Sequence, residues 1–193
     1  MARTSSKLRN TLETTIELEL NLDGSRTIDI STQVPFFDHM LTLLAFHAGF
    51  DLRIKAVGDV VVDDHHTVED VGILLGQAFL EALGDKRGIQ RYGLSYLPMD
   101  ETLSRCVVDI SNRPFLHYVA SYNRISIGGL SLENVQEFMK SFTTEARLSM
   151  HIEVLYGEND HHKVESLFKA LGRALYEAKS IRGDYVNSTK GLL

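Results

Sequence analysis

One segment of the sequence occurs twice, and this duplication limits the folds open to the chain more than any other feature. Residues 65–82 (HHTVEDVGILLGQAFLEA) align without a gap on residues 161–178 (HHKVESLFKALGRALYEA), with nine of the eighteen positions identical, a pair of histidines among them. A repeat of this length indicates two copies of one structural unit. We therefore expect residues 1–90 and 91–193 to form related halves of one compact unit.

The remaining segments predict strands and helices in a similar order in both halves. Alternating apolar and polar residues at 11–30, around the turn sequence DGSR, predict an antiparallel hairpin. Apolar residues at helical spacing predict a helix at 36–50, and the segment 51–63 has a strand pattern. In the second half, strand patterns lie near 105–122 and at 149–157, and helical patterns lie at 131–148 and 160–178.

These patterns predict an α+β fold built by internal duplication. A small sheet with helices on one face must bury those helices against another layer. In a duplicated chain, the helices of the two halves can cover each other between the two sheets. The chain has only three prolines and no Ser/Gly-rich linker, which favours one compact body.

The composition excludes several classes of function. A net charge of -6 and a pI near 5.7, without any basic run, argue against nucleic acid or an anionic membrane as the main partner. No apolar run approaches the roughly 18 residues of a membrane span. The start, MARTSSKLRN, lacks the apolar core of a signal peptide, so we expect a cytoplasmic protein. The single cysteine, Cys106, lies in an apolar strand pattern and is expected to be a buried thiol.

The two histidine pairs form a metal-ligand pattern. His65 with Glu69, and His161 with Glu165, stand four residues apart and share one face of a helix, so each pair can hold one ion. Adjacent residues of a helix point about 100° apart, so His65 and His66 should serve different ions. A single such motif could equally be a solvated helix start, but its repetition in a duplicated frame favours metal binding.

The symmetry of the halves suggests how each site is completed. We expect His66 to complete the second site and His162 the first, an assignment that rests on symmetry alone. His39 and Glu137 lie at comparable points on the earlier helices and would add one ligand each. Mixed imidazole and carboxylate ligands suit Mn, Fe, Co or Zn. The expected metal ligands are His39, His65, His66, Glu69, Glu137, His161, His162 and Glu165.

With these residues assigned, the chain resembles the imidazoleglycerol-phosphate dehydratases, which remove water from imidazole glycerol phosphate in histidine biosynthesis. The resemblance covers nearly the whole chain and is carried by RNTLET, FFDHM, FHAGFDL, GDVVVDDHHTVEDVGILLG, PMDETL, DISNRP, GENDHHKVESLFKALGRAL and STKG. It implies a hydro-lyase with a ribosomal protein S5 domain 2-like fold of two related halves. It also implies two Mn²⁺ ions per active site, the same eight ligands, and active sites between subunits of a shell of about twenty-four chains.

The resemblance also assigns residues to the substrate. It implies that the phosphate is held by Arg91, Arg113, Lys169, Ser188, Thr189 and Lys190. It implies that the rest of the substrate is contacted by Glu13, His39, His47, His65 and Glu69. The proton to be removed is not next to a carbonyl, so the imidazole ring must act as the electron sink. We expect Glu13 to carry a proton, with Glu69 or Glu165 as the alternative base.

The sequence departs from the family pattern at four positions, and two rival functions would use similar residues. Gln33 and Asn112 stand where the family commonly has glycine, Glu137 stands where many members have histidine, and Leu43 replaces a glutamine found in some relatives. A dinuclear metallohydrolase acting on a phosphate ester would use the same residue types and would release phosphate. A metal-storing shell would need the metal ligands but no cluster of cations for a phosphate.

Overall fold

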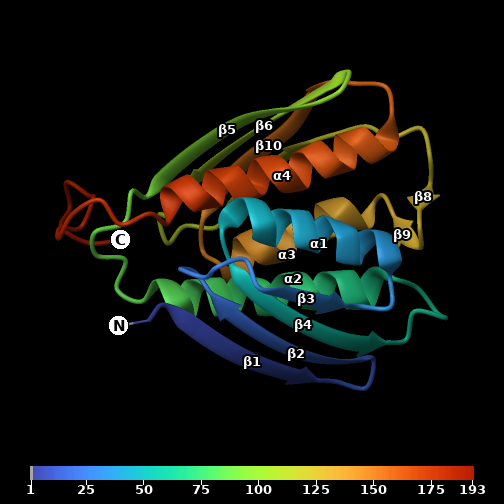
Figure 1. Ribbon diagram of the computed structural model, residues 1–193, viewed down its shortest axis with the longest axis horizontal. Coiled ribbons are helices and arrows are strands. Elements are labelled where there is room, and N and C mark those ends of the chain that lie inside the picture. The colour runs from blue at the N-terminus through green and yellow to red at the C-terminus, as the bar shows by residue number, and fades with distance from the viewer. Residues whose placement is uncertain (1) are drawn as a thin grey trace.

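The computed structural model describes residues 2–193 as two four-stranded sheets with four long helices between them (Figure 1). The first sheet has the strand order β1-β2-β4-β3, and the second has the order β5-β6-β10-β7. The elements of the first half are β1 (Thr4–Asn10), β2 (Thr14–Asn21), β3 (Ile28–Ser31), α1 (Pro35–Ala48), β4 (Asp51–Gly58) and α2 (His65–Leu83). Those of the second half are β5 (Tyr92–Met99), β6 (Thr102–Asp109), β7 (Phe115–Val119), β8 (Ser126–Ile127), β9 (Leu130–Ser131), α3 (Asn134–Glu145), β10 (Ser149–Tyr156) and α4 (Asp160–Ala178).

The two halves have the same topology, which confirms the predicted duplication. In each sheet, the first two strands are antiparallel neighbours (β1 with β2, β5 with β6). The last strand of each half, β4 or β10, pairs antiparallel with the second strand. The short third strand, β3 or β7, pairs in parallel with that last strand. The second half differs mainly by the small hairpin β8-β9, which is inserted before α3. The α+β class predicted from the sequence is therefore correct.

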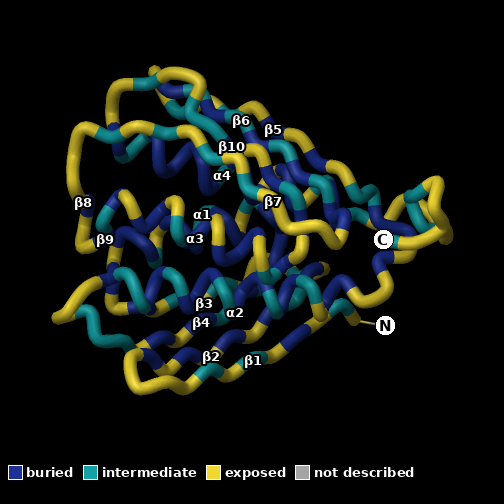
Figure 2. The backbone as a smooth tube through the Cα atoms, turned by 180° about the vertical axis from the view of Figure 1, so that it is seen from behind, coloured by how far each residue is buried: buried dark blue, intermediate teal, exposed yellow. Residues whose placement is uncertain are grey.

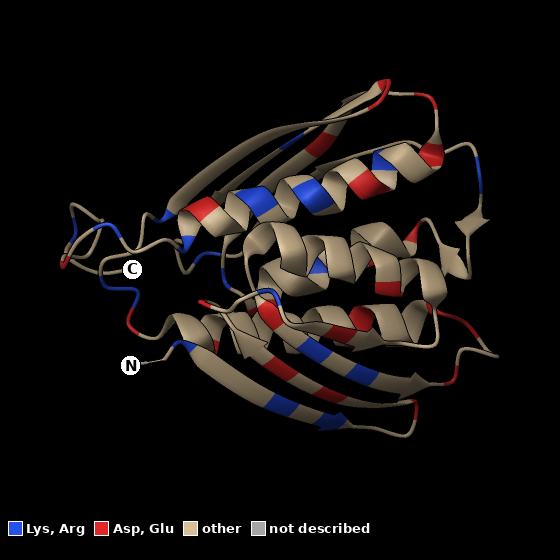
Figure 3. Ribbon diagram, in the orientation of Figure 1, with Lys and Arg blue, Asp and Glu red and all other residues tan. Residues whose placement is uncertain are grey.

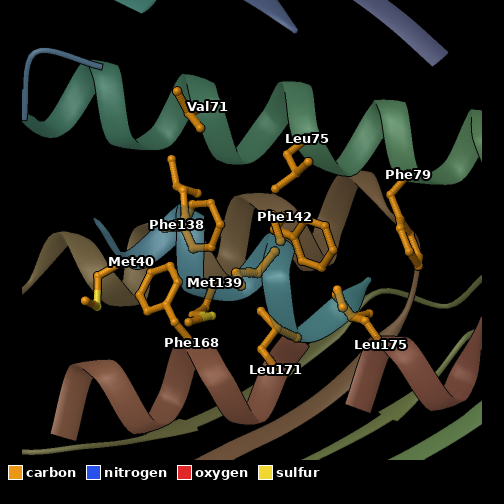
Figure 4. Packing of buried hydrophobic residues seen from close by; sticks show 14 of the residues in the cluster. Met40, Val71, Leu75, Phe79, Phe138, Met139, Phe142, Phe168, Leu171 and Leu175 are labelled. Carbon is orange, nitrogen blue, oxygen red and sulfur yellow. The ribbon is translucent and has the colours of Figure 1, made fainter. Parts of the chain in front are cut away.

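The helices form the middle of the molecule and hold the halves together. α2 lies on the first sheet and α4 on the second, and between them α1 packs on α4 and α3 packs on α2. Each of these helix pairs combines one helix from each half. The core between them is apolar, with Phe138 stacked on Phe168 at 5.2 Å between ring centroids and both side chains fully buried (Figure 4). Exposed residues gather on the outer faces of the sheets and in the loops (Figure 2).

The hairpin predicted for residues 11–30 is wrong. β2 pairs with β1 and β4, while β3 pairs in parallel with β4 and does not contact β2 as a strand neighbour. The reason lies at the turn, where the carboxylate of Asp51 in β4 accepts the backbone N–H groups of Ser25 and Thr27, each at 2.8 Å. These bonds hold the turn against β4. As a result, β4 lies between β2 and β3, the two strands that the alternating pattern had predicted to be neighbours.

Two of the departures from the family pattern lie in turns of unusual backbone geometry. Gln33 has φ 68° and Asn112 has φ 61°, which is the left-handed region that glycine adopts most readily. The backbone thus keeps a glycine-like conformation although the side chains are larger. Gln33 uses its side chain there, because its Oε1 accepts the N–H of Gly58 at 2.9 Å.

No helix among residues 2–193 combines the length and the apolar character needed to cross a bilayer. The longest helices, α2 and α4, are amphipathic and have 19 residues each. Their apolar sides face the core, and their first turns carry the histidine pairs.

Candidate metal centre

Three of the predicted ligands from both halves meet at the start of α4. One ligand atom from each of His39, His161 and Glu165 lies within 4.8 Å of the others. The Nε2 atom of His161 is 3.0 Å from Oε2 of Glu165, and Nε2 of His39 is 3.8 Å from the same oxygen. Because α1 packs on α4, the histidine of the first half reaches the pair of the second half.

The equivalent positions on α2 and α3 form a more open group. The Nε2 atom of His65 is 3.7 Å from Oε2 of Glu69, the same i and i+4 relationship as in α4. Glu137 extends from α3, which packs on α2, but its Oε2 forms an ion pair with Lys140 at 3.0 Å. The Nδ1 atom of His65 lies 2.9 Å from Oδ1 of Asn134, which fixes the orientation of the ring.

The histidine pairs are held at the helix starts by two equivalent aspartates. Asp64 and Asp160 directly precede the pairs, 96 residues apart, and both are buried. Asp160 accepts the backbone N–H groups of Asn123 and Arg124, each at 2.8 Å. Asp64 accepts the backbone N–H of Ser131 at 2.8 Å and its hydroxyl at 2.7 Å. The segment between β7 and α3 therefore ties the two motifs together.

The second histidine of each pair turns away from the three-ligand group of its own chain. The Nδ1 atom of His66 lies 3.0 Å from Oδ1 of Asp59, and its Nε2 lies 3.7 Å from Oε1 of Glu13. The Nδ1 atom of His162 lies 2.7 Å from Oε2 of Glu101. The group of three at α4 includes neither His66 nor His162, so the expectation that each of them completes a site of the other half stays a prediction.

The carboxylates shift the titration of these groups in a consistent direction. The hydrogen bond to Asp59 raises the pKa of His66, and the bond to Glu101 raises the pKa of His162. Backbone N–H donors and His162 hold the pKa of Glu101 far below its usual range. For Glu165, burial alone would raise the pKa, but the adjacent Lys169 and His161 together outweigh burial and lower it.

The donor set fits a divalent transition ion. Two nitrogens and a carboxylate oxygen are the ligand types that such ions share. Ligands bound at about 2.1 Å to one ion lie roughly 3 to 4 Å apart, and the separations between Glu165 and the two histidines, 3.0 and 3.8 Å, fall in this range. Glu165 is buried and ionised, with Oε2 toward the histidines and Oε1 toward Lys169. The residues at α4 can therefore hold such an ion with little rearrangement.

Most of the residues expected to hold the phosphate line a different pocket, at the C-terminal tail. This pocket has a volume of about 540 Å³ and combines two arginines, a lysine and four hydroxyl side chains with the last residues of the chain. Arg91 is fixed there by a two-bond contact with Asp109 and by donation to the carbonyl of Asn187 at 2.9 Å. Arg113, in contrast, is largely exposed and is held only by a 3.7 Å ion pair with Asp109 and a 3.5 Å hydrogen bond to the carbonyl of Ser111. The predicted residues in this pocket are Arg91, Arg113, Ser188, Thr189 and Lys190.

Lys169 and His47 do not lie with this pocket. The Nζ atom of Lys169 forms an ion pair with Oε1 of Glu165, which places the lysine beside the metal ligands of α4. His47 lies near the end of α1, where burial, followed by the charges of Lys169 and Arg173, lowers its pKa. The structure thus places the predicted residues of one chain in two groups. The metal end contains His39, His161 and Glu165 with Lys169 beside them, and the tail pocket lies at the C-terminal tail.

These two parts lie at opposite ends of α4 (Figure 1). His161 is the second residue of the helix, whereas Arg91 of the tail pocket donates its backbone N–H to the carbonyl of Ala178, the last residue of α4, at 2.9 Å. At about 1.5 Å per residue, the two ends are roughly 25 Å apart. A ligand much shorter than this distance cannot contact both ends of one chain.

Four acidic residues that support the histidines were not predicted from the sequence. Asp64 and Asp160 could have been found, because they occupy equivalent positions in the repeat and precede both motifs. Asp59 lies in the loop directly before α2, seven residues from His66, but no spacing pattern marked it, whereas Glu101 is brought beside α4 only by the sheet topology. Cys106 is buried as expected.

Comparisons with known proteins point to one family. The model of the family described as imidazoleglycerol-phosphate dehydratase matches residues 32–175. Curated proteins of this name from Clostridioides difficile and Bacillus subtilis are 54% and 52% identical, and cover 96% and 99% of this chain and 96% and 100% of their own lengths. The crystal structure of the Staphylococcus aureus protein of this name superposes with a TM-score of 0.84 at 43% identity, over 92% of this chain and 98% of that one.

Proposed function

The chain belongs to the imidazoleglycerol-phosphate dehydratase family, and we propose that it removes water from imidazole glycerol phosphate at a dinuclear manganese centre built between chains. It is a hydro-lyase of histidine biosynthesis, and the product is imidazole acetol phosphate. The observation that carries the proposed centre is the group of His39, His161 and Glu165, which unites ligands from both halves of the fold.

The second ion would be held by the equivalent residues on α2 and α3. His65 and Glu69 repeat the geometry of His161 and Glu165, and Glu137 can exchange its ion pair with Lys140 for a metal. When bound, two such ions lower the pKa of the ring nitrogens of an imidazole and make the ring a better electron sink. Mn²⁺ fits this mixture of nitrogen and oxygen donors, and other divalent transition ions are compatible with it.

The tail pocket is suited to the phosphate of the substrate. Arg113 is largely exposed and makes only a long ion pair with Asp109, at 3.7 Å, Lys190 has no ion pair within residues 2–193, and Ser188 offers a hydroxyl beside them. Arginine binds phosphate oxygens through two parallel hydrogen bonds, which fixes the orientation of the anion. On a chain of net charge -6, such a local cluster is needed to hold a dianion.

The distance between the metal end and the tail pocket supports a site shared by neighbouring chains. A substrate with a three-carbon chain spans less than about 10 Å. Its ring and its phosphate can therefore contact both parts only if the tail pocket of one chain lies against the metal end of another. His66 and His162, which leave their own clusters, are then free to bind ions held by a neighbouring copy. We propose a homo-oligomer with closed symmetry, a shell of about twenty-four chains.

The outer faces of the two sheets support association through the second half. The face of the first sheet is charged, with Glu19, Arg53 and Lys55 among its residues (Figure 3). The face of the second sheet carries the Arg105–Glu153 ion pair but also a group of exposed aromatic and aliphatic side chains, and an apolar patch of this kind marks a protein interface. Its exposed residues include Tyr92, Leu94, Tyr96, Phe115 and Val119.

Glu13 is the best candidate for the residue that carries a proton. It is exposed at the turn between β1 and β2, and its Oε1 lies 3.7 Å from Nε2 of His66. Glu165 is less suitable, because Lys169 and His161 keep it ionised and both of its oxygens are already in contact. Glu69 faces His65 and is expected to serve as a ligand. A carboxylate that is not a metal ligand can take up and release a proton without disturbing the binding of a metal ion.

A cytoplasmic location agrees with these properties, and we propose it for this chain. The single cysteine is buried and unpaired, so the fold needs no oxidising compartment. Within residues 2–193, no helix could anchor the chain in a bilayer. The substrate is a small phosphorylated imidazole, a polar molecule that must reach the site through water.

An assay with the stripped protein tests the proposed function. The purified chain is freed of metal with a chelator and mixed with imidazole glycerol phosphate, with and without added Mn²⁺. Formation of the enolisable ketone is followed by ultraviolet absorbance, and free phosphate is measured in parallel. We expect ketone only after Mn²⁺ is added, and no phosphate. Release of phosphate would indicate a metallohydrolase, and full metal loading without any reaction would indicate a storage shell.

A further inference from the structure

Glu13 and Glu101 occupy the same position in the two halves. Each directly precedes the first residue of the second strand of its sheet, Thr14 in β2 and Thr102 in β6. Each therefore lies at the turn that brings the sheet beside the start of the helix with the histidine pair. Their nearest histidines, His66 and His162, are also equivalent in the repeat.

The two glutamates nevertheless contact different sides of these equivalent rings. Oε2 of Glu101 accepts a hydrogen bond from Nδ1 of His162 at 2.7 Å. Glu13 lies on the opposite side of the ring of His66, 3.7 Å from Nε2. The Nδ1 atom of His66 is bound instead by Asp59, at 3.0 and 3.1 Å from its two oxygens. In the first half, Asp59 thus accepts the hydrogen bond from the Nδ1 atom of the histidine, and in the second half Glu101 accepts it.

Glu101 is itself held rigidly. Its Oε1 accepts the backbone N–H groups of Glu158 and Asn159, at 3.1 and 2.8 Å, and the hydroxyl of Thr102 at 3.0 Å. The side chain therefore connects the turn of the sheet to the loop before α4, and it presents only Oε2 to His162. Glu13 has no comparable set of backbone donors among the contacts of residues 2–193.

We propose that Asp59 and Glu101 are positioning residues that hold the proton of each ring on Nδ1 and present Nε2 to a metal, and that Asp59 thereby leaves Glu13 free for proton transfer. This inference rests on the proposed metal-dependent function. A histidine ligand commonly donates its second N–H to a carboxylate, which fixes both the tautomer and the direction of the ring. The duplication supplied two equal glutamates, and the carboxylate of Asp59 allowed one of them to take another role.

The variant Glu101→Gln separates this positioning role from a role in folding. The amide oxygen can still accept the N–H groups of Glu158 and Asn159, so the loop stays in place. The NH₂ group then faces Nδ1 of His162, which must accept a hydrogen bond, and the ring proton moves to Nε2. The nitrogen intended for the metal is thereby blocked. Asp59→Ala removes the acceptor of His66 without affecting any other side-chain hydrogen bond of Asp59 among residues 2–193.

The test compares the affinity for Mn²⁺ of these variants with that of Glu13→Gln. Dissociation constants are obtained by competition with a chelator, bound manganese is counted by mass spectrometry, and its coordination is followed by electron paramagnetic resonance. We expect Glu101→Gln and Asp59→Ala to bind Mn²⁺ about 10- to 100-fold more weakly. Glu13→Gln should bind it as the unaltered chain does, although it occupies the equivalent position. Glu158→Gln, an exposed glutamate of the same loop, is the matched control.

Two outcomes would overturn the inference. One is unchanged affinity in both Glu101→Gln and Asp59→Ala, and the other is an equal loss of affinity in Glu13→Gln. Circular dichroism of each variant shows whether it is folded, and Glu101→Gln remains informative if Asp59→Ala unfolds. An unaltered chain that binds no Mn²⁺ at all would contradict the proposed metal-dependent function instead, so the two failures are distinguishable.

Discussion

Gly76 and Gly172 lie 96 residues apart, and each marks the place where a helix of one half crosses a helix of the other. A methyl group on Gly172 would lie 2.7 Å from the carbonyl oxygen of Leu44 in α1, and one on Gly76 would lie 2.7 Å from the carbonyl oxygen of Phe142 in α3. The two halves thus approach each other at matching points, and both points require the smallest side chain.

Replacement of Gly172 by alanine should destabilise the chain, although alanine favours a helix more than glycine does. The gain in helix propensity is at most about 1 kcal/mol. The overlap with backbone atoms of α1 forces the helices apart and costs about 1 to 3 kcal/mol. Denaturant unfolding of Gly172→Ala measures the net effect. An increase in stability would show that the crossing of α1 and α4 tolerates a wider separation.

The stability of the chain should depend on the ionisation of Asp51. The bond from the backbone N–H of Thr27 is the main cause that lowers the pKa of this carboxyl, and the bond from Ser25 adds to it. A lowered pKa in the folded state gives stability that is complete above the unfolded pKa, about 3.9, and is lost as the pH falls through the folded value. Asp51→Ala should therefore lose about 1 to 2 kcal/mol at pH 7, and its difference from the unaltered chain should shrink below about pH 4. Denaturant titrations at several pH values measure this; a difference that does not depend on pH would contradict it.

Glu13→Gln should lower kcat by about 10²- to 10⁴-fold, because the amide cannot carry a proton. The KM should change little, since the phosphate is held by other residues. Steady-state kinetics with saturating Mn²⁺ give both constants. If kcat of Glu13→Gln stays near that of the unaltered chain, Glu69 or Glu165 must carry the proton.

Arg113→Ala and Lys190→Ala should raise KM about 10-fold or more, because each removes a cation from the tail pocket. Binding of Mn²⁺ should not change, since the metal end lies at the other end of α4. Arg53→Ala, an arginine on the outer face of the first sheet, is the matched control for a loss of positive charge. Equal kinetic effects in Arg53→Ala and Arg113→Ala would place the phosphate elsewhere.

Periodic local signals predicted most of the fold. The helix starting at His65 and the one at 160–178 were correct, because helical spacing and the following glycine or polar turn are encoded next to each other. The pairing of β3 was not predicted, because it depends on hydrogen bonds between Asp51 and a turn 24 to 26 residues away. Local alternation identifies a strand but does not identify its neighbour.

In the candidate site, too, relationships within one helix were predicted and contacts between distant segments were not. The spacing of His161 and Glu165 placed them correctly on one face, since a helix fixes that relationship. The meeting of His39 with this pair follows from the packing of α1 on α4, which joins the two halves and is not encoded in either segment alone. Glu101 was missed because the turn between β5 and β6 meets the start of α4 only in the folded sheet, and Asp59 was missed because no regular spacing links it to His66 in the neighbouring helix. Which residues hold the ions and the substrate stays a prediction until metal and substrate binding are measured.

The separation of the metal end from the tail pocket has a genetic consequence. If every reaction uses the ligands of one chain and the cations of another, two defective forms can restore each other. His161→Ala and Lys190→Ala should each be inactive when expressed alone. When the two are expressed together, some interfaces combine the intact metal end of one with the intact tail of the other, and activity should return, whereas proteins mixed after assembly should stay inactive. Two inactive alleles of the one gene would then complement each other, because the two ends of α4 would contribute to active sites shared with different neighbouring chains.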